Sequence, residues 1–156
     1  MPDVDPARVV ADADVLAADL FVDGDARAAL DHVRRHSWVD LAVSGHLLDD
    51  AEAVAAALGD AALAADWRET LEAEAVVVDH PAGDQPALAT AQASGAAHVL
   101  AYDETLRSAR TAAELSGRVD VSVKAPDAFA RLFDPEALYA AVVGGDYPGP
   151  DRDPRA

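Results

Sequence analysis

Short apolar runs alternate with helical segments along most of the chain, and this alternation restricts the fold more than any other feature. The runs are too short for buried helices and are predicted as strands at about residues 8–11, 39–43, 76–78, 98–102 and 119–123. Strands joined through helices run parallel, because each crossover returns the chain to the same edge of the sheet. The sequence therefore predicts an α/β protein, a three-layer α/β/α sandwich with a central, mainly parallel five-stranded sheet.

Residues that favour helix ends mark the segments between these strands. Ser44 is expected to cap a helix that ends at Gly59, with Leu47, Val54 and Leu58 on its buried face. The predicted helices cover about residues 25–36, 45–58, 61–74, 85–95, 104–115, 127–133 and 135–143. From residue 144 onward, proline, glycine and charge dominate. We therefore expect one domain over residues 1–143 and a disordered, acidic, Pro- and Gly-rich tail over residues 144–156.

The charge balance indicates the environment of the protein. Twelve basic residues face 29 acidic ones, the net charge is −17, and Lys124 is the sole lysine. Such a chain has too many periodic apolar residues to be disordered. At about 1 M salt the Debye length is only ~3 Å, so a dense carboxylate coat is tolerated. We therefore expect a folded protein of a salt-loving cell.

Several classes are excluded by what the sequence lacks. It has no cysteine, which excludes disulfides and thiolate metal sites. The first residues lack the basic and apolar regions of a secretion signal. No stretch approaches the ~20 apolar residues that a membrane span needs. We expect a cytoplasmic protein without contact to a membrane.

Four acidic residues stand where a site is expected. Asp12 and Asp103 each follow an apolar strand, Asp84 precedes a predicted helix, and Asp50 lies on the helix after Ser44. In open parallel sheets, ligands bind beyond the carboxyl ends of the strands. Taken singly, each acid has a simpler interpretation, which is a helix cap for Asp12 and Asp84 and a solvated surface position for Asp50.

Five motifs then resemble, in order, those of the PIN domain family. They are Asp-Ala-Asp-Val-Leu from Asp12, Ser44 followed by Asp50, Asp-Gln-Pro from Asp84, His-Val-Leu-Ala-Tyr-Asp ending at Asp103, and Val-Lys-Ala-Pro-Asp-Ala-Phe from Val123. The resemblance covers roughly residues 8–133 and points to a PIN-like ribonuclease of haloarchaeal type. The chain departs from the family where Asp14 replaces the usual Asn, Asp50 the usual Glu, and Tyr102 a small residue.

The resemblance implies a nuclease that depends on Mg²⁺ or Mn²⁺ and hydrolyses single-stranded RNA. The implied catalytic and metal-binding residues are Asp12, Asp50, Asp84 and Asp103, with Asp14 and Ser44 as accessory residues. Converging carboxylates repel one another, and hard divalent ions that prefer oxygen ligands relieve that repulsion. Ser44 can contact a phosphate or Asp12, or act only as a helix cap. The resemblance also suggests a homodimer and, in a toxin–antitoxin pair, an antitoxin protein as partner.

Basic residues for RNA binding are few. The candidates are the cluster Arg34-Arg35-His36 and the scattered Arg68, Arg107, Arg110 and Arg118. At molar salt, counterion release contributes little, so a basic stripe is less necessary. His46 and His80 are expected to be surface or structural residues.

Two other interpretations stay open. The first is a catalytically inactive PIN-like module that binds RNA or protein. The second is an Asp-based phosphotransfer domain, because Asp12-Ala-Asp14 resembles the Asp-x-Asp of haloacid-dehalogenase-like phosphatases. A response-regulator receiver would instead use Asp79 as phosphoacceptor, together with Lys124. Lys124 follows Asp103 where the phosphatase order needs a preceding lysine, and the receiver has no room for the extra predicted helix.

Overall fold

The computed structural model describes residues 4–83, 85–104, 106 and 121–154. The predicted helix at 104–115 and the start of the predicted strand at 119–123 lie largely outside this part of the chain. The elements are β1 Asp5–Ala11, α1 Ala13–Phe21, α2 Asp25–Arg34, β2 Asp40–Ser44, α3 Gly45–Leu58, α4 Ala61–Glu74, β3 Val76–Val78, α5 Pro86–Ser94, β4 Ala96–Leu100, β5 Ser122–Lys124, α7 Pro126–Leu132 and α8 Pro135–Val142.

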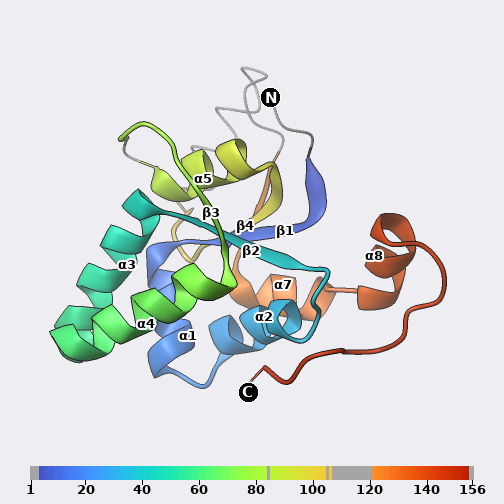
Figure 1. Ribbon diagram of the computed structural model, residues 1–156, viewed down its shortest axis with the longest axis horizontal. Coiled ribbons are helices and arrows are strands. Elements are labelled where there is room, and N and C mark those ends of the chain that lie inside the picture. Colours follow the sequence, from blue (N-terminus) through green and yellow to red (C-terminus); the bar gives the residue numbers. More distant parts are fainter. Residues whose placement is uncertain (1–3, 84, 105, 107–120, 155–156) are drawn as a thin grey trace.

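The strands form one five-stranded sheet in the order β3-β2-β1-β4-β5. Every neighbouring pair is parallel, which confirms the predicted fold class. Figure 1 shows α5 on one side of the sheet and α1, α2, α4 and α7 on the other. These are the three layers expected when each crossover must cover a face of a parallel sheet.

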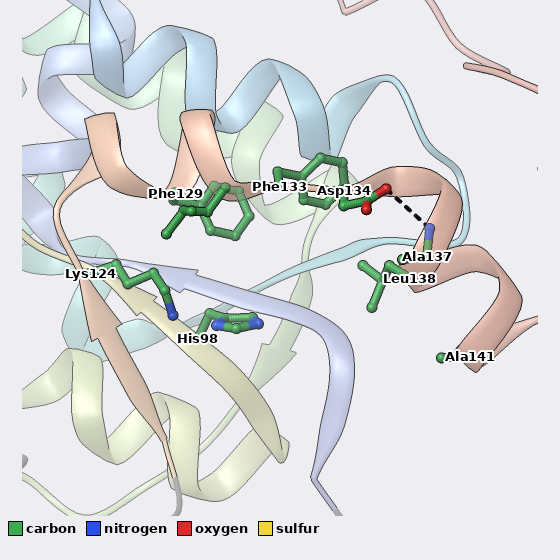
Figure 2. Close-up of a pocket in the computed structure, with 9 residues that line it drawn as sticks. His98, Lys124, Phe129, Phe133, Asp134, Ala137, Leu138 and Ala141 are labelled. Carbon is green, nitrogen blue, oxygen red and sulfur yellow. Dashed lines mark hydrogen bonds between the residues drawn. The ribbon is translucent and has the colours of Figure 1, made fainter.

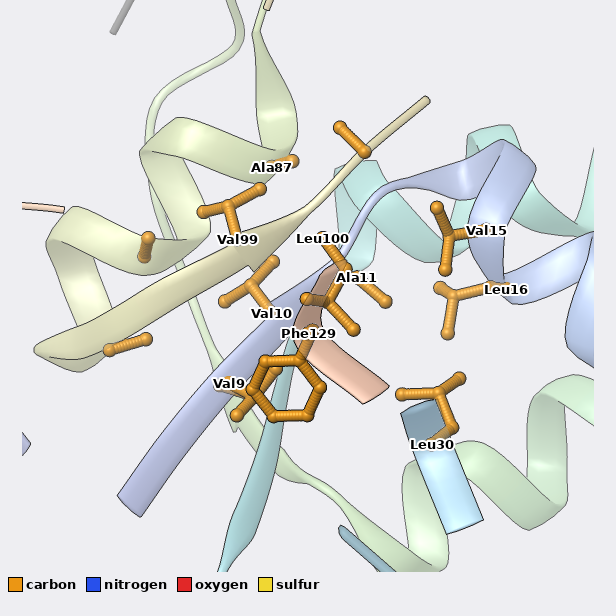
Figure 3. Close-up of a cluster of buried hydrophobic side chains, with 14 of the residues drawn as sticks. Val9, Val10, Ala11, Val15, Leu16, Leu30, Ala87, Val99, Leu100 and Phe129 are labelled. Atoms are coloured by element: carbon orange, nitrogen blue, oxygen red, sulfur yellow. The ribbon is translucent and has the colours of Figure 1, made fainter. Parts of the chain in front are cut away.

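The central strand β1 is buried on both faces, which explains its continuous apolar sequence. Val10 packs beside Val99 on the side of α5, whereas Val9 faces Leu30 and Phe129 (Figure 3). Each of these five side chains is at most 4% exposed. The core therefore holds the sheet from both faces and fixes where its strands end.

Most predicted helix ends are confirmed. Ser44 caps α3, with its hydroxyl accepting from the amide of Leu47, and Gly95 ends α5 in the left-handed conformation at φ 73°. The expectation that Leu58 is buried is wrong, since this side chain is 66% exposed. Leu58 is in the last turn of α3, beyond Ala55, the last buried residue of that helix. None of the described helices is both long and apolar enough to cross a bilayer.

The segment from residue 144 onward is predicted from composition to be a disordered tail, whereas the structure places its described part against the end of α2. The Tyr147 hydroxyl lies 2.6 Å from Nε2 of His36, and the amide of Asp151 donates to the carbonyl of Arg35 at 2.9 Å. The last carbonyls of a helix have no partner within it and need outside donors. The segment supplies such donors, a role that composition does not reveal.

Leu30→Ala is expected to lower the free energy of unfolding by about 2–5 kcal/mol, because it leaves a cavity in the packed core. The measurement is urea unfolding in constant molar salt. Leu58→Ala is the matched control and should change stability by less than about 0.5 kcal/mol, since its side chain is largely in water. Equal losses in the two variants would contradict the assigned core.

Candidate functional site

The carboxyl ends of β1 and β4 lie side by side at the centre of the sheet. Ala11 is in register with Leu100, and the amide of Asp12 donates to the carbonyl of Leu100 at 2.9 Å. From β1 the chain continues to β2 on one side, whereas from β4 it continues to β5 on the other. At such a switch in direction, open α/β sheets bind ligands in a crevice beyond the strand ends. The position beyond the ends of β1 and β4 is called the crevice below. Asp12 directly follows β1, and Asp103 comes three residues after the last residue of β4.

Asp12 carries the clearest electrostatic signature of the crevice. Its Oδ1 accepts from the amide of Ala13 at 2.9 Å, so the residue caps α1. Burial raises the pKa of Asp12, and the negative charges of Asp14, Asp103 and Asp50 raise it further against the opposing effect of the Ala13 hydrogen bond. The fold therefore brings these three acids within electrostatic range of Asp12, as the sequence predicted for Asp50 and Asp103.

Asp14, the accessory acid, belongs to the same cluster. Partial burial raises the pKa of Asp14, and the charge of Asp103 adds to this, while the amide of Val15 opposes it by donating to Oδ1 at 2.9 Å. Asp14 thus increases the negative charge of the crevice.

The two neighbouring acids of α3 have different surroundings. The Asp49 carboxylate pairs with Nη1 of Arg68 at 2.6 Å, and Glu52 pairs with the same nitrogen at 2.9 Å. Asp50 is exposed and raises the pKa of Asp12. One of the two acids is therefore neutralised between α3 and α4, and the other contributes to the crevice.

The described acids do not form a closed coordination shell. No three Asp, Glu or His side chains of the described residues are arranged so that they could hold a metal ion. Asp84, the remaining predicted ligand, lies outside the described residues. The donors of the crevice are carboxylates, which is the ligand chemistry that hard divalent ions such as Mg²⁺ and Mn²⁺ prefer.

Ser44 is fully buried at the end of β2 and joins three elements. His80 has Nδ1 2.8 Å from the carbonyl of Pro81, so this nitrogen carries the proton and Nε2 accepts from the Ser44 hydroxyl at 2.8 Å. Thr90 of α5 has its hydroxyl 2.8 Å from that of Ser44. The Ser44 hydroxyl thus takes part in hydrogen bonds within the protein, and its predicted role as a helix cap is confirmed.

The role of Thr90 was not identified from the sequence, and His80 was expected only as a surface or structural residue. The local sequence offers one indication of a special role for Thr90, which is a polar residue among the alanines of α5. In the structure the Thr90 side chain is fully buried. His80 lies 36 positions after Ser44, so no local pattern connects them.

Two members of the predicted basic cluster, Arg34 and His36, have partners within the protein. Arg34 pairs with the buried Asp19 and with Asp31, and His36 is 2% exposed beneath Tyr147. Three further candidates lie outside the described residues: Arg107, Arg110 and Arg118. In the part of the chain that is described, arginines mainly hold elements together.

The sheet order opposes the receiver hypothesis. Asp79 follows β3, which is the edge strand, and β2 lies between β3 and β1. Two strand spacings separate the ends of β1 and β3 by about 10 Å. Receivers have the order 2-1-3-4-5, in which the third strand neighbours the first. Asp79 is therefore not placed beside Asp12 as a phosphoacceptor would be.

Comparison with known families places the whole described chain in one family. Residues 3–155 match a family of unknown function (DUF7384), and the protein belongs to that family. The match includes the segment that packs on α2. No curated protein matches the sequence. The resemblance to PIN domains stays a prediction.

Asp12→Asn is expected to raise the free energy of unfolding at pH 7. The pKa of Asp12 is higher in the folded than in the unfolded state, so its ionisation disfavours folding increasingly as pH rises through that range. Asn keeps the helix cap and removes the charge. In urea unfolding at constant molar salt, the gain should shrink as pH is lowered towards about 4.

Asp49→Asn is the matched control, because it removes an ion-paired charge next to Asp50 on α3 and should not stabilise the fold. If Asp12→Asn were less stable than wild type at pH 7, the proposed repulsion in the crevice would be excluded.

Proposed function

We propose that this protein is a metal-dependent nuclease that hydrolyses single-stranded RNA at the acidic crevice. The proposed ligands and catalytic residues are Asp12, Asp50, Asp84 and Asp103. The observation that carries the proposal is that Asp14, Asp50 and Asp103 lie within electrostatic range of the half-buried Asp12, which follows the central strand at the switch point of the sheet. The motifs that resemble PIN domains include these same acids.

Arginines pair with several acids of the described chain, but not with Asp12 or Asp50. Arg68 pairs with Asp49 and Glu52 on the neighbouring surface, whereas neither Asp12 nor Asp50 has an ion pair among the described residues. Uncompensated carboxylates destabilise one another, and a divalent cation would relieve the repulsion. The crevice therefore has the chemistry of a cation site.

The acids of the crevice would have different roles in phosphodiester hydrolysis. Asp12, held by the amide of Ala13, is fixed at the start of α1 independently of any ligand. A bound divalent ion supplies a Lewis acid that lowers the pKa of water and stabilises charge on the phosphate. Asp50, exposed on a different element, would orient the attacking water and accept its proton. Asp103 and Asp84 would complete the ligand set.

A second candidate is a catalytically inactive PIN-like module. The observation in its favour is that no three acids or histidines of the described chain are arranged to hold an ion. The two candidates differ in metal affinity and in cleavage, and both can be measured on the purified protein.

The first test is cleavage of labelled single-stranded RNA in molar KCl with Mn²⁺. Asp12→Asn and Asp103→Asn should each lower the rate by about a hundredfold or more, since each removes a charged group of the site. Asp49→Asn should cleave like wild type, because Asp49 pairs with Arg68 outside the crevice. Equal rates in all four proteins would identify a contaminating nuclease and remove the catalytic proposal.

The second test is calorimetric titration of the RNA-free protein with Mn²⁺. Wild type should bind the ion and be stabilised against heat by it, because a ligand that binds only the folded state raises its stability. Asp12→Asn should bind more weakly, and Asp49→Asn should match wild type. Absence of binding by wild type at about 10 mM Mn²⁺ would favour the inactive module, since a site filled under working conditions has a lower Kd.

A further inference from the structure

A pocket of about 400 Å³ lies between the sheet and the last two helices. Figure 2 shows His98 and Lys124 on the strand side, facing Phe129 of α7, Phe133 directly after that helix, and Leu138 of α8. None of the residues that line it belongs to the acidic crevice. Pockets of roughly 300–1,000 Å³ with apolar walls and a few polar groups are typical of small-molecule sites.

The strand side of the pocket carries a positive charge. Lys124 is the sole lysine in a chain of net charge −17, and its stem lies along the sheet with its ammonium donating to Ser122. Among the described residues that line the pocket, Asp134 is the one acid, and it belongs to the turn between α7 and α8 and caps α8 through the amide of Ala137 at 3.1 Å. An anionic group is therefore favoured on the strand side.

His98 presents an unsatisfied polar atom in the same place. Its Nδ1 is buried and has no hydrogen-bond partner within the described chain. Burial, and then the positive charge of Lys124, lower the pKa of His98, so the ring is neutral at pH 7. A neutral ring can carry its proton on Nδ1 and donate it to an anion. Buried polar atoms in native proteins rarely lack a partner, which suggests that a ligand supplies one.

The opposite walls are apolar and incompletely packed. Phe129 and Phe133 lie with ring centroids 5.5 Å apart, and the ring of His98 meets Phe129 edge to face at 5.9 Å. The neighbouring helix α8 has no buried residue. An apolar body between these rings and Leu138 would remove apolar surface from water, which favours binding.

We propose that this pocket binds a small amphipathic carboxylate, with its carboxylate against Lys124 and His98 and its apolar body between Phe133 and Leu138. One ammonium and one imidazole suit a singly charged head group. A cationic ligand would be repelled by Lys124, and a purely apolar one would leave Nδ1 of His98 without a partner. The proposal does not depend on the nuclease activity.

The test titrates octanoate into the full-length protein in constant salt, followed by NMR chemical shifts and calorimetry. Octanamide serves as the uncharged probe of the same shape. Octanoate should bind with one-to-one stoichiometry, perturb His98 and Phe129, and bind more tightly than octanamide. Lys124→Gln should weaken octanoate binding at least about fivefold, as expected for the loss of one ion pair, and leave octanamide unchanged.

Arg131→Gln is the matched control, since Arg131 is an exposed base on α7 that does not line the pocket, and it should bind octanoate like wild type. Lys124→Arg should retain binding. If Lys124→Gln does not fold, the preference of wild type for octanoate over octanamide decides the question. Absence of binding, equal binding of the two probes, or equal affinity in folded Lys124→Gln would overturn the proposal. Asp12→Asn should bind octanoate normally, which separates this result from the nuclease tests.

Discussion

The parallel pairing of β1 with β4 is the constraint on which the candidate site depends. Val10 pairs with Val99 and Ala11 with Leu100, so both strands end at the same level. All four of these side chains are fully buried, and helices cover both faces of the sheet. The core therefore prevents Asp12 from moving away from Asp103 to relieve their repulsion. Burial, and then the charges of Asp14, Asp103 and Asp50, raise the pKa of Asp12 in a geometry that hydrophobic packing imposes.

Elsewhere in the described chain, basic residues pair with acids where two helices meet, so the repulsion at Asp12 stands out. Arg68 joins α3 to α4 through Asp49 and Glu52, and Arg34 joins α2 to α1 through the buried Asp19. In both places, guanidinium groups lie where acids of two helices meet. The crevice has a comparable gathering of acids, yet Asp12 has no ion pair within the described residues. Such a cluster destabilises a folded protein least when a bound external cation compensates its negative charge.

The sequence predicted those features that depend on local patterns. Apolar runs such as Val9-Val10-Ala11 predict buried strands, and Ser44 at the start of α3 predicts its cap. The features that it did not predict depend on contacts between distant residues, such as Tyr147 on His36, 111 positions apart. The candidate acids are an intermediate case. Asp12, Asp84 and Asp103 were visible as acids at the ends of predicted elements, but only the strand order shows that Asp12 and Asp103 follow adjacent strands.

The crevice and the pocket illustrate how a highly acidic protein can recognise anions. At molar salt the Debye length is ~3 Å, so an exposed base exerts little attraction beyond direct contact. Recognition of an anion then requires a cation held in the crevice or a basic side chain sheltered by the protein. Lys124 meets the second condition, because it is partly buried beside apolar rings and its field is screened less by salt. The chemistry of the two places is opposite, so a ligand suited to one is excluded by the charge of the other.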